Sequence, residues 1–75
     1  MSQMKLTEGQ RRRCADITTL DEAEDIIDEH LSRVEVHVRT TEFVVDIILE
    51  VSRSVSACEV REQLETRAAF TELSR

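Results

Sequence analysis

The chain contains no proline and a single glycine, Gly9, among its 75 residues. Small β-sandwiches and barrels need many tight turns, and those turns depend on glycine and proline for their backbone conformations. This chain is therefore poorly suited to an all-β fold. Apolar residues make up 40% and charged residues 35% of it, which is typical of a folded helical protein rather than a disordered segment. We predict a single helical domain over residues 1–75, with residues 1–6 forming a flexible N-terminal arm.

Four patterns predict where helices begin. Three fit a capping box, in which a Ser or Thr side chain bonds the third helical amide and a Glu or Gln three residues on bonds the cap's own amide. These three are residues 7–10, 19–22 and 56–59. The fourth is Thr40, followed by Glu42 in the first turn, where the helix dipole favours an acid. The spacing of these starts predicts an all-α bundle of three to four helices with short connections.

The second predicted helix runs from Leu20 to about Val34 or Val38 and carries one apolar stripe. Its members are spaced three or four apart, as on one face of a helix. They are Leu20, Ala23, Ile27, Leu31, Val34 and Val38. The end of this helix is ambiguous, because residues 34–38 alternate between apolar and polar like a half-buried strand. We interpret them as the helix end or an extended connection, with a short strand as the alternative.

The segment from Phe43 to Val55 is apolar at most positions. Its charged residues, Asp46, Glu50 and Arg53, are spaced four and three apart and form one narrow polar stripe. A helix that is apolar on most of its circumference is normally buried on most of its circumference. This segment is therefore predicted to be the central helix of the bundle.

The two remaining predicted helices have weaker patterns. Residues 57–73 are amphipathic, with Val60, Leu64 and Ala68 expected to face inward. Residues 8–16 have little apolar content, so this helix is expected to fray or to pack only against a partner.

The small size of the chain favours an apolar contact with another protein or with a second copy. A core in this size range rarely contributes more than about 3–5 kcal/mol. Part of the central helix is therefore expected to stay exposed and to pack on a helix of a partner, and the alternative is a monomer in which the other helices wrap the central one. The candidate apolar binding residues are Val44, Ile48, Val51 and Val55.

The charge distribution adds two further candidate binding patches. The formal net charge of −6 argues against general nucleic-acid binding, which needs an excess of Lys and Arg. A basic candidate patch is formed by Arg11, Arg12 and Arg13, although adjacent helical arginines point in different directions. The acidic candidates, which would steer a basic partner, are Asp21, Glu22, Glu24, Asp25, Asp28 and Glu29.

We find no sequence feature that indicates an enzyme, a cofactor or a metal site. Phosphate-binding, dinucleotide, metalloprotease and calcium-loop motifs are absent. The two histidines, His30 and His37, are expected at the surface or its boundary, and their spacing from Cys14 and Cys58 is too wide for a typical zinc site. Two cysteines are too few for a disulfide scaffold, so we expect reduced thiols and a cytoplasmic location, with one Cys14–Cys58 bridge as the alternative. No apolar run is long enough to cross a membrane.

These observations favour a small acidic, non-enzymatic protein that binds another protein or itself through helix packing, as a subunit, adaptor, chaperone or inhibitor. The first alternative is an acidic inhibitor that mimics nucleic acid and occupies the basic channel of a larger protein. The second is a dimeric DNA-binding regulator, in which the three arginines would touch the DNA.

Overall fold

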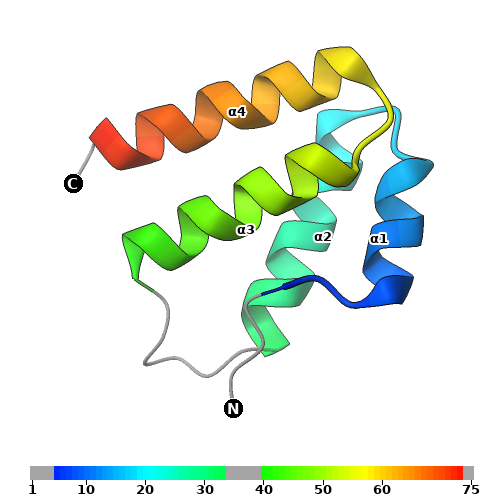
Figure 1. The fold of residues 1–75 in the computed structure, drawn as a ribbon, viewed down its shortest axis with the longest axis horizontal. Helices are drawn as coiled ribbons and strands as arrows, with labels where there is room; N and C mark the ends of the chain where they lie inside the picture. The colour runs from blue at the N-terminus through cyan, green and yellow to red at the C-terminus, as the bar shows by residue number, and fades with distance from the viewer. Residues whose placement is uncertain (1–4, 34–39, 74–75) are drawn as a thin grey trace.

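A computed structural model describes residues 5–33 and 40–73 of the chain. These residues form four α-helices, α1 (Glu8–Ala15), α2 (Leu20–Arg33), α3 (Thr41–Ser54) and α4 (Cys58–Leu73), and no strand (Figure 1). The predicted small all-α bundle is confirmed. Residues 34–38, for which a helix end and a strand were weighed, lie outside the described residues, as do residues 1–4 of the predicted arm.

Helices α3 and α4 lie side by side and run in opposite directions, joined by residues 55–57 (Figure 1). Helix α2 passes behind α3, and α1 contacts both α2 and α3. The molecule is a thin slab, with extents of 31 × 29 × 16 Å.

Helix α3 supplies the largest share of the core, as its composition predicts. Its buried residues include Phe43, Ile47 and Val51, and the side chains of Ile47 and Val51 have no solvent-exposed area. Helix α4 contributes the three residues that its amphipathic pattern predicts to face inward, Val60, Leu64 and Ala68. The hydrophobic effect therefore joins α3 and α4 into the central unit of the fold.

The weak apolar content of α1 does not leave it frayed or unpacked, so that expectation is wrong. Leu6, Cys14 and Ile17 belong to the core, and Leu6, expected in the flexible arm, is buried. Leu6 and Ile17 lie just before and just after α1, and the helix itself buries Gln10 and Cys14, which are four positions apart on one side. One narrow buried side is enough to attach α1 to the rest of the chain.

His30 is buried, with 4% of its surface exposed, and is not the surface residue that we expected. Its Nδ1 atom lies 3.0 Å from Oε1 of Gln10, a residue of α1 that is itself 3% exposed. Because the amide oxygen of Gln10 can only accept, Nδ1 of His30 is the donor in this bond. Helix α2 thus buries a side that includes His30 and Ile26, both absent from the predicted apolar stripe. His30 can be buried on this side of α2 because the Oε1 atom of Gln10 in α1 accepts a hydrogen bond from its Nδ1 atom.

Three of the four predicted cap residues, Thr7, Thr19 and Thr40, cap a helix, and the bonds at Thr7 and Thr40 match the prediction in full. The Thr7 hydroxyl accepts from the Gln10 amide at 3.1 Å, and the Gln10 side chain accepts from the Thr7 amide at 3.0 Å, which completes the capping box. The Thr40 hydroxyl accepts from the Phe43 amide at 3.1 Å. These two predictions are confirmed.

The other two capping boxes differ from the prediction. Thr19 accepts from the Glu22 amide at 3.3 Å, but the Glu22 carboxylate accepts from the amide of Thr18 rather than from that of Thr19. Helix α4 begins at Cys58, so the residue before it is Ala57, which has no side-chain acceptor. Ser56, the predicted cap, lies one residue before the actual cap position.

This difference between Thr40 and Ser56 predicts unequal effects of the same kind of substitution. Thr40→Ala removes the hydroxyl that bonds the first turn of α3 and should lower the free energy of unfolding by about 1 kcal/mol. Ser56→Ala removes an exposed hydroxyl outside α4 and should change the free energy of unfolding by less than about 0.5 kcal/mol. Urea unfolding followed by circular dichroism measures both values. Equal losses for the two variants would contradict the assigned helix starts.

Candidate functional site

The three consecutive arginines of α1 do not form one basic surface. Each of them makes an ion pair in a different direction: Arg11 with Glu50 of α3 at 3.0 Å, Arg12 with Glu8 of α1 at 3.1 Å, and Arg13 with Glu29 of α2. Neighbouring positions on a helix are about 100° apart, so the side chains diverge. The three guanidinium groups therefore pair with carboxylates of three different helices, α3, α1 and α2.

The predicted acidic residues of α2 separate into two groups. Glu24 and Glu29 are partly buried and pair with Arg67 and Arg13, respectively. Asp21, Glu22, Asp25 and Asp28 are exposed. Three of these, Asp21, Asp25 and Asp28, are spaced four and three apart and lie on one face of the helix, which we call the aspartate stripe.

The predicted apolar binding face of α3 is mostly covered by the chain itself. Ile48, Val51 and Val55 are 4%, 0% and 1% exposed, so the expectation that they form an open face is wrong for these three. Other parts of the chain pack on that side of α3 and bury it within the core. Val44 is half-buried and still reaches the surface.

A groove between α2, α3 and α4 brings members of the predicted apolar and acidic sets together. Its volume is about 210 Å³, and it is lined by Glu24, Ile27, Asp28, Leu31, Val44, Ile48, Arg67 and Thr71. We call it the α2–α4 groove. Four of these residues are aliphatic, and the Arg67–Glu24 ion pair connects α4 to α2 at the groove. Val44, Ile48, Glu24 and Asp28 were predicted as binding residues, whereas Arg67 and Thr71 were not.

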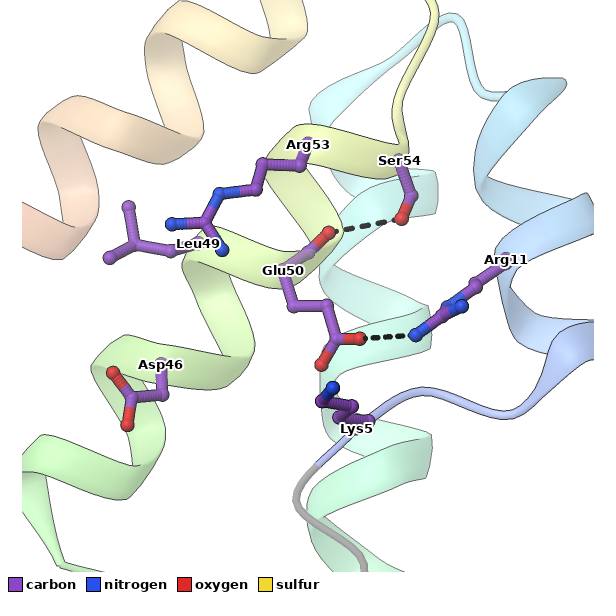
Figure 2. A pocket seen from close by; sticks show the side chains of 7 residues that line it. All are labelled: Lys5, Arg11, Asp46, Leu49, Glu50, Arg53 and Ser54. Carbon is purple, nitrogen blue, oxygen red and sulfur yellow. Dashed lines mark hydrogen bonds and ion pairs between the residues drawn. The ribbon is translucent and has the colours of Figure 1, made fainter.

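A second hollow lies between α1 and α3, and we call it the α1–α3 cleft. It has a volume of about 590 Å³ and is lined by Lys5, Arg11, Asp46, Leu49, Glu50, Arg53 and Ser54. The polar stripe predicted on α3 therefore faces this cleft. Figure 2 shows Arg11 and Lys5 near the Glu50 carboxylate, with Asp46 and Arg53 on the other side of Glu50 from Arg11.

The central carboxylate of the α1–α3 cleft is already paired within the chain. Glu50, at its centre, accepts from Arg11, and its backbone oxygen accepts from the Ser54 hydroxyl at 3.1 Å (Figure 2). Its lining residues carry charges of both signs, and none of them is a cysteine or a histidine. Within residues 5–33 and 40–73, no three His, Cys, Asp or Glu side chains come together in a group that could hold a metal ion.

The two cysteines have different environments, and neither is in a disulfide. Cys14 has no exposed surface, and its burial raises the pKa of the thiol, an effect that Arg13 opposes and Glu50 reinforces. A raised pKa lowers the fraction of thiolate, which is the nucleophilic form. Cys58 is exposed at the start of α4.

The chain matches no protein-family model, and neither a curated protein sequence nor a solved structure shows significant similarity to it. No helix in the described part of the chain is long and apolar enough to span a membrane. The described residues form a small bundle of four helices, and the α2–α4 groove is its candidate binding site.

Proposed function

We propose that this chain is a non-enzymatic interaction protein that binds another protein through the α2–α4 groove. One observation carries the proposal. The surface groove is lined both by aliphatic side chains of α2 and α3 and by the carboxylates of Glu24 and Asp28. Such a combination suits a partner that presents an apolar side chain next to a Lys or Arg.

The size of the groove favours a protein side chain over a small molecule. Its volume of about 210 Å³ is below the range of about 300–1,000 Å³ that is usual for small-molecule pockets. Ile27 and Ile48 are buried and supply an apolar floor, while Val44 and Leu31 are half-buried. An inserted apolar side chain would therefore lose its hydration on several sides without leaving a buried polar group unpaired.

The surrounding charge supports a basic partner. The chain has a net charge of −6, and the exposed Asp28 belongs both to the groove and to the aspartate stripe. An extended negative surface increases the rate at which a positively charged partner associates, and this effect decreases with salt. The groove would then provide the salt-tolerant part of the affinity and the stripe the salt-sensitive part.

The groove can be tested with two matched aspartate variants of α3. Val44 lines the α2–α4 groove and Leu49 lines the α1–α3 cleft, and both are half-buried apolar residues. Val44→Asp should weaken binding of a purified partner by at least about tenfold, because a carboxylate would enter the apolar site, whereas Leu49→Asp should retain binding. The partner is first captured from lysate treated with nuclease and then titrated in purified form. Retained binding by a folded Val44→Asp variant would refute the proposed site.

The exposed aspartate stripe supports a second candidate, the acidic inhibitor that mimics nucleic acid. Its three carboxylates lie on one helix face, as a row of phosphates would. Changing Asp21 and Asp25, which do not line the groove, together to Asn distinguishes the two functions. A mimic loses binding in this double variant and at moderate salt, and it tolerates Val44→Asp. A protein that binds through the groove loses binding in Val44→Asp and keeps most of it in the double variant and at moderate salt.

A further inference from the structure

The α1–α3 cleft is the larger of the two hollows described above, and its size suits a small molecule. Its volume of about 590 Å³ lies within the range of about 300–1,000 Å³ that is usual for small-molecule sites, whereas the α2–α4 groove lies below that range. The two hollows share no lining residue, so a test of one does not decide the other. The side chains of the cleft indicate the chemistry of a ligand that would fit it.

The cleft has an excess of positive charge, although the chain as a whole is acidic. Three of its seven lining residues are basic and two are acidic, in a chain with a net charge of −6. The basic residues are Lys5, Arg11 and Arg53. A concave site lined by an excess of one charge raises the local concentration of ligands with the opposite charge, so this cleft favours an anion.

Two of the three cations have no carboxylate partner in the described part of the chain. Arg11 pairs with Glu50 at 3.0 Å, which neutralises both groups. Lys5 and Arg53 are exposed, and neither makes an ion pair with another described residue. Lys5 precedes α1 whereas Arg53 belongs to α3, so two separate segments of the chain each bring one cation to the cleft. Both ammonium and guanidinium groups bind carboxylates through charge-assisted hydrogen bonds.

The placement of these two cations favours a ligand with two acidic groups. Figure 2 shows the Lys5 ammonium group and the Arg53 guanidinium group at separate places around Glu50. A compact anion such as phosphate can contact one of them, whereas a dicarboxylate holds its charges several bonds apart and can contact both. The half-buried Leu49 provides an apolar surface for the carbon chain between the two carboxylates. A long polyanion would extend beyond the cleft onto the acidic remainder of the surface and be repelled.

We propose that the α1–α3 cleft binds a small dicarboxylate, with one carboxylate on Lys5 and the other on Arg53. The Arg11–Glu50 ion pair stays intact and separates the two contacts. Charge pairs at exposed sites contribute little each, so the complex is weak, with a dissociation constant of about 1–10 mM.

Titration of the isotope-labelled chain with glutarate, followed by NMR at constant ionic strength, tests the site. The amide signals of Lys5 and of residues 49–54 should shift and reach saturation. Pentanoate, which has the same number of carbon atoms but one carboxylate, should bind at least about threefold more weakly, and so should inorganic phosphate. If either control binds as tightly as glutarate, or if no signal saturates up to about 50 mM glutarate, the proposal is overturned.

Three variants separate the contacts in the cleft from a general effect of charge. Arg53→Gln removes one contact and should weaken glutarate binding at least about threefold, while the fold is retained because Arg53 is exposed and outside the ion pairs of the described chain. Arg33→Gln changes an exposed arginine of α2 that does not line the cleft, and should leave the affinity nearly unchanged. Asp46→Asn removes an exposed carboxylate from the cleft and should tighten binding. Equal weakening by Arg53→Gln and Arg33→Gln would show that glutarate responds to net charge alone, which contradicts the proposed site.

Discussion

Replacing Ile47 with alanine should leave a large fraction of the molecules unfolded at room temperature. Ile47 lies in the middle of α3 and has no exposed surface. Removing its outer carbons costs about 2–5 kcal/mol, which combines the lost transfer free energy with the cavity left behind. A core in this size range contributes only about 3–5 kcal/mol of net stability, so the two quantities are comparable.

The matched control for this prediction is Ile47→Val, which removes a single methyl group and should cost about 0.5–1.5 kcal/mol. The helical signal in circular dichroism, followed through a urea titration, gives the free energy of unfolding for both variants. If the alanine and valine variants unfold at the same urea concentration, Ile47 does not occupy the closely packed position that the structure assigns to it.

Replacing Gln10 with leucine should be the most damaging change of a polar side chain. The Oε1 atom of Gln10 accepts from the Thr7 amide and from Nδ1 of His30, each at 3.0 Å. Leucine fills a similar volume but accepts neither bond, so α1 loses half of its capping box and His30 keeps a buried donor without a partner. A cap of about 1 kcal/mol and a buried unpaired donor of about 1–3 kcal/mol are lost, and the removal of the Gln10 Nε2 atom, which is buried without a hydrogen-bond partner, offsets part of this, so the expected net loss is about 1–3 kcal/mol.

Thr7→Ala is the control for this change, because it removes the threonine side of the capping box and leaves the His30 bond intact. Its expected cost is about 1 kcal/mol. The difference between the two variants therefore measures the contact between α1 and α2. Hydrogen exchange should show the amides of α1 losing protection in Gln10→Leu before those of α3 do. If Gln10→Leu is no less stable than Thr7→Ala, the buried bond to His30 makes no net contribution.

The sequence predicted those parts of the fold that depend on neighbouring residues. Thr7 and Thr40 cap helices because their hydroxyls need only an amide three residues away, and the pattern is visible in any short segment. The apolar composition of residues 43–55 predicted that α3 is central. It did not predict which side of α3 remains open, because that depends on where the other helices pack.

The sequence predicted the candidate site only in part, because local patterns reveal single residues but not which helices pack together. Val44 and Glu24 were singled out from local patterns, and both line the α2–α4 groove. Arg67 belongs to the groove only because α4 folds back to place it beside Glu24, 43 positions earlier in the chain. The burial of His30 likewise requires Gln10, 20 positions away, and no periodicity within α2 indicates such a partner. Local patterns do not predict contacts between segments that are distant in the sequence.

The contrast between the two thiols has a practical consequence for spectroscopy. Cys58 is exposed while Cys14 is fully enclosed, with a thiol pKa raised by its burial. The unaltered chain thus has one addressable attachment point for a fluorophore, at the beginning of α4, and one thiol hidden from the reagent. The rate at which the Cys14 thiol is modified would then report how often α1 opens, and no substitution is needed for this measurement.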